Sequence, residues 1–67
     1  KDEYQLALAD FNQSLKRKPD YAKAHLNRGL VYYQMDKTDQ ACSDFQKACD
    51  HGDCDGSKWA KKNAICK

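Results

Sequence analysis

The chain repeats part of itself at an interval of 34 residues, and this repetition constrains the fold more than any other feature. Identical residues recur at that interval in these pairs: Asp2 and Asp36, Ala7 and Ala41, Asp10 and Asp44, and Phe11 and Phe45. In each copy the spacing Ala-x-x-x-Phe puts both side chains on one face of a helix. The interval therefore predicts stacked helical units that resemble one another.

Few residues interrupt the helical composition of the chain, which has 67 residues, one proline and three glycines. We predict helices over residues 2–17, 21–35, 39–51 and 57–66, because alanine, leucine, lysine and glutamine dominate and no strand-like alternation occurs. The connections are short enough to make neighbouring helices antiparallel. The predicted fold class is all-α, in a single small domain.

Charge and hydropathy exclude two classes of partner. Twelve basic and ten acidic residues give a net charge of +2, which is too small to indicate a nucleic-acid-binding protein. No apolar run approaches the roughly 20 residues of a transmembrane helix, so we expect no membrane span. The chain begins at Lys1, not at methionine, which favours a processed protein or an excised fragment.

The repeat resembles the tetratricopeptide repeat (TPR) family, whose motif reads W-x2-L-G-x2-Y, then A-x3-F, then P. Residues 22–55 are similar to one complete repeat. The matching positions are His25, Arg28, Gly29, Tyr32, Ala41 and Phe45, with Asp53 where proline is usual. His25 and Arg28 depart from the family's tryptophan and leucine.

The flanking segments resemble half repeats. Residues 1–21 are similar to the second half of a preceding repeat, with Pro19 at the expected offset. Residues 56–67 resemble the first half of a following repeat or a capping helix, with Trp59 at the tryptophan position and Asn63 in place of glycine. The resemblance implies a right-handed superhelical stack of antiparallel helices.

The resemblance also implies a non-catalytic scaffold that binds a partner peptide or helix in a concave groove. The residues expected to face this groove are Lys23, Leu26, Asn27, Leu30, Tyr33, Gln34, Ala60 and Lys61. Asn27 and Lys61 match positions that hold a peptide's terminal carboxylate in one TPR subclass, but Ser57 replaces a required basic residue there. We expect the head of Arg28 to be solvated.

The first helix has no preceding helix to cover its apolar face. At least one of Tyr4, Leu8 or Phe11 is therefore expected to be partly exposed. This favours either a longer array or self-association through the N-terminal helix.

The cysteines admit several interpretations. Cys42 and Cys49 lie about 10.5 Å apart along one helix, at about 1.5 Å per residue, which exceeds the roughly 7 Å that a disulfide spans. Antiparallel packing brings Cys42 beside Cys66 and Cys49 near Cys54, so we predict the disulfides Cys42–Cys66 and Cys49–Cys54. The repeat aligns three of the cysteines with apolar residues, which leaves buried free thiols as the alternative.

These alternatives bear on the compartment and on chemistry. Disulfides indicate the periplasm, the cell surface or secretion, whereas free thiols indicate the cytoplasm. A third alternative is a metal site built on Cys49-x-His51-x2-Cys54, although the usual paired spacing of zinc ligands is missing. The sequence has no C-x-x-C pair, no triad and no glycine-rich phosphate loop, so we expect no catalytic residues, no enzyme activity and no cofactor.

Overall fold

The computed structural model describes residues 2–66, apart from the side chain of Asp2, and these residues form four helices. The helices are α1 (Asp2–Arg17), α2 (Ala22–Gln34), α3 (Thr38–Asp50) and α4 (Asp55–Lys62). No strand occurs in this part of the chain, and the predicted all-α fold is confirmed. The two ends of the predicted domain, Lys1 and Lys67, lie outside the described residues.

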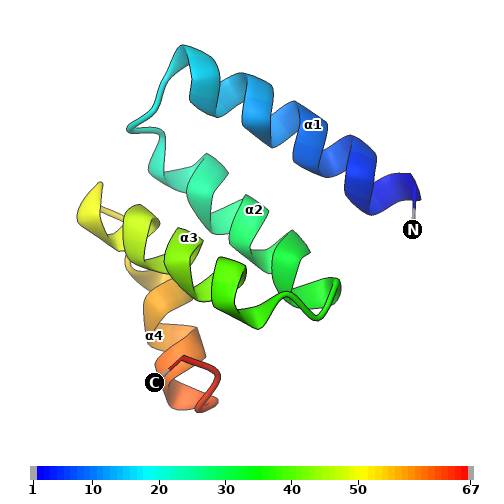
Figure 1. Cartoon of the computed structure of the whole chain (residues 1–67). Helices are drawn as coiled ribbons and strands as arrows, with labels where there is room; N and C mark the ends of the chain where they lie inside the picture. The colour runs from blue at the N-terminus through cyan, green and yellow to red at the C-terminus, as the bar shows by residue number, and fades with distance from the viewer. Residues whose placement is uncertain (1, 67) are drawn as a thin grey trace.

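The helices stack side by side in a thin layer (Figure 1). Of the helices described, α2 contacts all the others, whereas α1 contacts only α2. The layer measures 29 × 27 × 14 Å, so most helices keep one broad face open to solvent. None of these helices is both long enough and apolar enough to cross a membrane.

The last three helices end in the same kind of turn. A residue with left-handed backbone follows each helix: Asp36 (φ 63°), Gly52 (φ 105°) and Ala64 (φ 55°). The next backbone N–H then donates to a carbonyl five residues earlier, at 2.8 Å in all three turns. This arrangement satisfies carbonyl groups that the helix leaves free, and it reverses the chain.

The fourth helix was predicted over residues 57–66, and this prediction is wrong at both ends. The helix begins earlier, at Asp55, whose N–H donates to the carboxylate of Asp53 at 3.2 Å. It ends earlier, at Lys62, because the left-handed Ala64 breaks the helical backbone. The other three helices end within one residue of their predicted bounds.

Phe45 occupies the centre of the core, where it is 1% exposed. Its ring fills space left by Gly29 of α2 and Gly56 of α4. A Cβ atom at Gly29 would lie 2.8 Å from ring atom Cε1, and one at Gly56 would meet the ring and Leu26. Both neighbouring helices can therefore approach α3 closely only because these positions lack a side chain.

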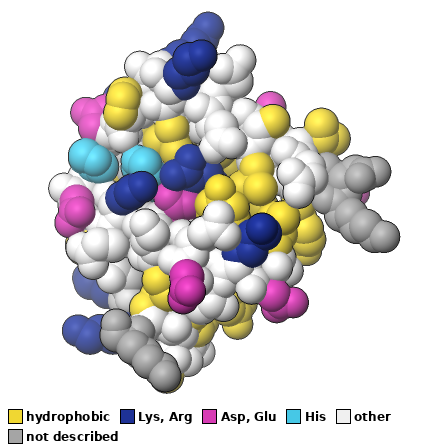
Figure 2. Space-filling model, in the orientation of Figure 1, with side chains coloured by type: hydrophobic (Ala, Val, Ile, Leu, Met, Phe, Trp, Pro, Cys, Tyr) yellow, Lys and Arg dark blue, Asp and Glu magenta, His cyan; other side chains and the backbone are white. Residues whose placement is uncertain are grey.

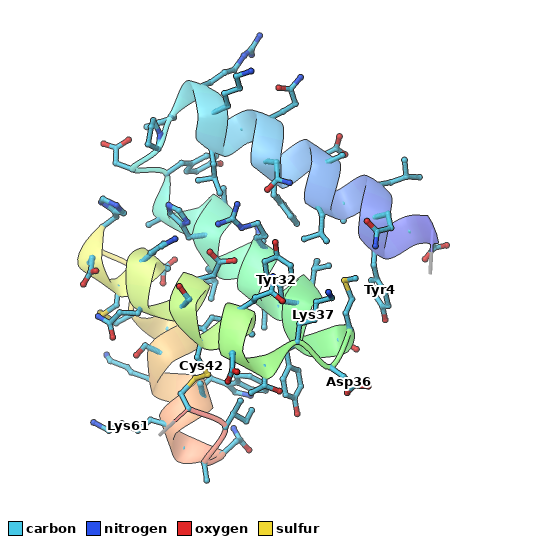
Figure 3. The ribbon with its side chains drawn as sticks, in the orientation of Figure 1. Tyr4, Tyr32, Asp36, Lys37, Cys42 and Lys61 are labelled. Carbon is cyan, nitrogen blue, oxygen red and sulfur yellow. A yellow bond between two sulfur atoms is a disulfide. The ribbon has the colours of Figure 1, made fainter. Side chains whose placement is uncertain are left out.

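Leucines pack α1 on α2, and at the equivalent positions of α3 disulfides join it to the residues just before and just after α4. Leu8 and Leu15 are buried under α2. The residues 34 positions later are Cys42 and Cys49. Cys42 is bridged to Cys66, with Cα atoms 5.7 Å apart (Figure 3).

The second bridge joins Cys49 to Cys54, with Cα atoms 3.9 Å apart, across the turn that contains Gly52. These two pairs are the ones predicted from antiparallel packing. The bridges also use both sulfur atoms that the metal-site alternative required.

Candidate functional site

An apolar groove lies between α2 and α4. It has a volume of about 260 Å³ and is lined by Leu26, Leu30, Asp55, Gly56 and Trp59. Leu26 and Leu30 are one helical turn apart on α2, and Gly56 and Trp59 are three residues apart on α4, so each pair shares a helix face. Because Gly56 has no side chain, the floor of the groove lies close to the core.

Trp59 is held in place although it is exposed. Its ring packs edge-on against Tyr33, with centroids 5.2 Å apart, and against the buried Phe45, with centroids 6.0 Å apart. Such edge-to-face contacts fix the orientation of an aromatic ring. Trp59 remains 38% exposed and Leu30 39% exposed, so the groove offers a preformed apolar surface.

The predicted groove residues fall into two sets. Leu26 and Leu30 line the groove, and Tyr33 reaches its edge through Trp59. Lys23 is not part of the lining, and it forms an ion pair with Asp53 at 3.5 Å.

The remaining predicted residues lie elsewhere. Asn27 is half-buried and Gln34 is exposed, and neither belongs to the lining. Lys61 faces a separate depression of about 200 Å³, which Gln46, Ser57 and Cys66 also line. Ala60 is fully buried, so its expected place in the groove is wrong. These positions do not form a carboxylate clamp with the groove.

Sequence reasoning expected Ala60 and Lys61 of α4 in the groove and missed the residues of α4 that line it. Trp59 was assigned only a repeat-motif role, and Gly56 and Asp55 were not assigned to the groove. The signal was the spacing of Gly56 and Trp59, which puts a gap and a large ring on one helix face.

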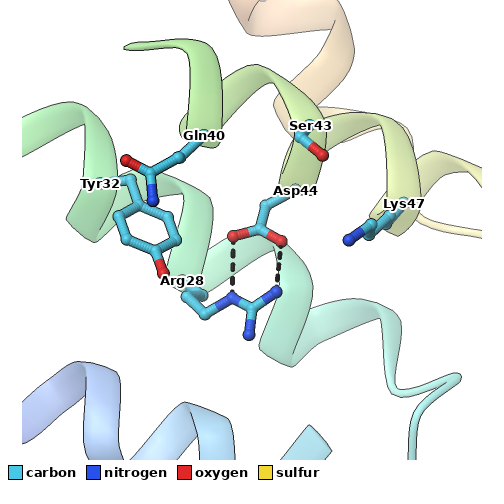
Figure 4. A pocket seen from close by; sticks show the side chains of 6 residues that line it. All are labelled: Arg28, Tyr32, Gln40, Ser43, Asp44 and Lys47. Carbon is cyan, nitrogen blue, oxygen red and sulfur yellow. Dashed lines mark hydrogen bonds and ion pairs between the residues drawn. The ribbon is translucent and has the colours of Figure 1, made fainter. Parts of the chain in front are cut away.

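A buried ion pair joins α2 to α3 (Figure 4). Arg28 donates to both carboxylate oxygens of Asp44, at 2.8 and 2.7 Å, and Asp44 is only 2% exposed. A third donor of Arg28 reaches the side-chain oxygen of Asn12 on α1 at 2.8 Å. The expected solvated head of Arg28 is therefore wrong, because its donors bind within the protein.

The ion pair affects the protonation of Arg28. The hydrogen bond to Asp44 is the main reason that the pKa of Arg28 is raised, with burial acting in the opposite direction. Because the folded pKa is the higher one, the stabilisation persists at ordinary pH and is lost only in strong alkali. With its hydrogen bond to Asn12, Arg28 joins α2 to both α3 and α1.

His25 lies next to this ion pair. Its Nε2 is 2.8 Å from the carbonyl oxygen of Pro19 and must donate to it, so Nε2 carries a proton. Its Nδ1 is buried without a hydrogen bond, 3.7 Å from the Asp44 carboxylate. The ring stacks on His51 at 5.7 Å, and Figure 2 shows the two histidines side by side near basic side chains.

Metal-ligating side chains do not gather elsewhere in the described part of the chain. Within residues 2–66 no group of three or more His, Cys, Asp or Glu side chains converges on one point. The two histidines are stacked, which aims their nitrogens along the ring planes and not at a shared ion.

Comparison with protein families agrees with the arrangement of the helices. A family model described as TPR repeat matches residues 1–36, and a second, described as Tetratricopeptide repeat, matches residues 22–51. The chain belongs to the tetratricopeptide repeat family. Proteins of this family generally mediate protein–protein interaction.

Neither the curated proteins nor the solved structures include a match to this chain. The family is thus established by the repeat itself, and the partner has to be inferred from the groove.

Proposed function

We propose that the chain is a non-catalytic interaction module that binds a segment of a partner protein in the groove between α2 and α4. The observation that supports this most is the preformed apolar surface of Leu30 and Trp59. Exposed aromatic and aliphatic side chains in a fixed concave site are typical anchors for a peptide. In this proposal the groove lies between a complete repeat, residues 22–55, and the half repeat of residues 56–67, and another half repeat spans residues 1–21.

The lining indicates the chemistry of the segment. The floor is apolar, so one large apolar side chain of the partner would enter it. Asp55 is the charged member of the lining and is exposed. A lysine or arginine next to the apolar anchor would pair with Asp55, which favours a short segment that combines both side chains.

The proposal involves no bond-making step. The strongest donors of the polar cluster, those of Arg28, are already bound to Asp44 and Asn12. The two bridges support a place in an oxidising compartment, that is, the periplasm, the cell surface or the extracellular space.

Replacing Leu30 with aspartate is expected to weaken peptide binding by at least about 10-fold, because it puts a charge on the apolar floor. The probes are peptides selected from a displayed library of random short sequences with the oxidised chain as bait. Titration calorimetry measures their affinity, and the selected peptides should share an apolar residue next to a basic one.

Leu6→Asp is the matched control, since Leu6 is an exposed leucine on α1, 67% exposed and outside the groove. This variant should bind the selected peptides as the unchanged chain does. Peptides that bind Leu30→Asp as tightly as the unchanged chain would exclude the groove as their site.

We also propose a second role, as a structural cap at the C-terminal end of a longer array, which a separate observation supports. α4 stops at Lys62, whereas α2 continues well past the equivalent Arg28. The chain then turns back, so that Ile65 packs against the core and Cys66 bridges Cys42. A further helix that packed on α4 as α3 packs on α2 would meet Asn63 where α2 has a glycine.

Replacing both Cys42 and Cys66 with serine is expected to cost about 3 kcal/mol, because that bridge closes a loop with a sequence separation of 24. The matched variant with serine at Cys49 and Cys54 should lose less, about 2 kcal/mol, since its separation is 5. Urea unfolding measures both losses.

If the residues after α4 cap the array, only the variant without the Cys42–Cys66 bridge should associate as its concentration rises. Sedimentation velocity detects this association. Equal stability losses, or a first variant that stays monomeric, would contradict the cap.

A further inference from the structure

A polar pocket lies between α2 and α3. It has a volume of about 180 Å³, and the ion pair of Arg28 and Asp44 forms part of its wall (Figure 4). Arg28 and Tyr32 line it from α2, and each lies two positions after a groove residue, Leu26 or Leu30. Two positions correspond to about 200° around a helix of 3.6 residues per turn. The pocket and the groove therefore lie on opposite sides of α2 and share no lining residue.

α3 supplies most of the polar groups of this pocket. Gln40, Ser43, Asp44 and Lys47 are spaced by three or four residues, so they share one helix face. The side chains of Gln40, Ser43 and Lys47 are exposed, and they form no hydrogen bond or ion pair with another described residue. Gln40 and Lys47 lie on opposite sides of the ion pair (Figure 4). The pocket thus presents an amide, a hydroxyl and an ammonium group to a ligand.

The pocket has a net positive charge. Its lining holds two cations, Arg28 and Lys47, and one anion, Asp44, so the net charge is +1. Arg28 and Asp44 neutralise each other through two hydrogen bonds, at 2.8 and 2.7 Å. The ammonium of Lys47 is then the uncompensated charge, and a ligand with a single negative charge would balance it.

Asp44 also offers hydrogen-bond acceptors to a ligand that enters the pocket. Each of its carboxylate oxygens accepts one hydrogen bond from Arg28. A carboxylate oxygen has two lone pairs, so each oxygen keeps one for another donor. Nδ1 of His25 lies 3.7 Å from one of these oxygens, which is too far for a hydrogen bond. A ligand hydroxyl can therefore donate to Asp44, whereas a ligand carboxylate beside Asp44 would be repelled.

We propose that this pocket binds a sugar acid, that is, a molecule that carries several hydroxyl groups and a single carboxylate. The ligand carboxylate pairs with the ammonium of Lys47, and one ligand hydroxyl donates to Asp44. Gln40 and Ser43 bind further hydroxyls, because an amide and a hydroxyl can both donate and accept hydrogen bonds. This site is separate from the peptide groove between α2 and α4.

The same groups make the pocket selective. A neutral sugar leaves Lys47 without an ion pair. A simple carboxylate without hydroxyls leaves the free lone pairs of Asp44 without a donor. A sugar phosphate carries a charge of about −1.5 to −2 at pH 7, which exceeds the net charge of the lining. Only a ligand with one carboxylate and several hydroxyls satisfies both Lys47 and Asp44.

The probe for this site is glucuronate. It is titrated into the isotope-labelled, oxidised full chain at constant ionic strength, and the backbone amide signals are followed by NMR. Saturable shifts are expected at Gln40, Ser43 and Lys47. Glucose, propionate and glucose 6-phosphate are titrated in the same way, and each should bind at least about 10-fold more weakly than glucuronate.

Substitution of exposed residues tests the site without disturbing the core. Lys47→Met is expected to weaken glucuronate binding at least about 10-fold, because it removes the cation that pairs with the carboxylate. Gln40→Leu should weaken binding about 5-fold, because it removes one neutral hydrogen-bonding group. Lys58→Met is the matched control, since Lys58 is an exposed lysine on α4 outside the lining, and it should bind glucuronate normally. Circular dichroism checks that each variant is folded.

A free sugar acid and the terminal unit of an acidic glycan share this chemistry. A trisaccharide that ends in glucuronate distinguishes the two sources. If the trisaccharide binds at least as tightly as glucuronate, the ligand is the end of a glycan. If it binds more weakly, the ligand is the free acid, because the rest of a glycan does not fit beside the pocket.

Three results would overturn the proposal. Glucuronate that causes no saturable shifts, or shifts only outside the lining, would show that the pocket is not its site. Propionate, glucose or glucose 6-phosphate that binds as tightly as glucuronate would show that the pocket does not recognise a sugar acid. Normal binding of glucuronate to Lys47→Met would show that the ammonium does not hold the carboxylate.

Discussion

Replacing Phe45 with alanine is expected to remove most of the stability that the hydrophobic core supplies. Removal of a buried phenylalanine side chain costs about 3–5 kcal/mol, from lost burial and from the cavity that remains. A core of this length supplies only about 3–5 kcal/mol. The Phe45 ring also lies against both Gly29 and Gly56, so its removal opens a cavity where α3 meets α2 and α4. Far-UV circular dichroism with urea unfolding measures the loss.

Phe11→Ala provides the matched control, because Phe11 occupies the equivalent position on α1. Phe11 is only half-buried, so the same substitution is expected to cost about 1 kcal/mol. Equal losses at the two positions would mean that Phe45 does not hold the helices together, contrary to its burial.

The second large effect is expected from Arg28→Met. The substitution leaves the carboxylate of Asp44 buried and without its two strongest hydrogen bonds. Removal of one partner of a buried ion pair costs about 3–5 kcal/mol, since the remaining charge is desolvated without compensation. His25 does not replace the arginine, because its Nδ1 lies 3.7 Å from Asp44. Thermal unfolding followed by circular dichroism measures the loss.

The double variant Arg28→Met, Asp44→Leu distinguishes the effect of a buried unpaired charge from the effect of lost packing. Apolar replacement of both partners is often neutral or stabilising. The double variant should therefore recover most of the stability that Arg28→Met loses. A double variant no more stable than the single one would show that the arginine stem, and not the charge pair, holds α2 and α3 together.

The fold was predictable because its signals are local and repeated. Ala41, Phe45 and Gly29 set how closely α2 and α3 approach, and the interval of 34 residues repeats the first two as Ala7 and Phe11. Antiparallel helices of known length also place Cys42 beside Cys66. The early end of α4 was not predictable in this way, because Ala64 gives no sign in the sequence of a left-handed backbone.

The candidate site was only half predictable. The groove positions of Leu26 and Leu30 follow from the helical periodicity of α2, because the repeat motif shows which face of this helix packs on α3. The groove also depends on how far α4 approaches α2, and that distance is set by Gly56 against Leu26 and Phe45, residues from three helices. The ion pair of Arg28 was missed for a similar reason, since Asp44 was aligned with Asp10 but not given a partner.

Leu8 and Leu15, which pack α1 on α2, correspond to Cys42 and Cys49 of α3. This difference changes when each of the two contacts can form. A junction made of leucines forms as soon as the helices meet, whatever the surroundings. A junction made of sulfur–sulfur bonds forms only after the thiols have lost electrons to an oxidant. It follows that the residues on either side of α4, the helix that carries Trp59, are tied to α3 only after an oxidant has acted, whereas the packing of Gly56 against Phe45 needs no such step.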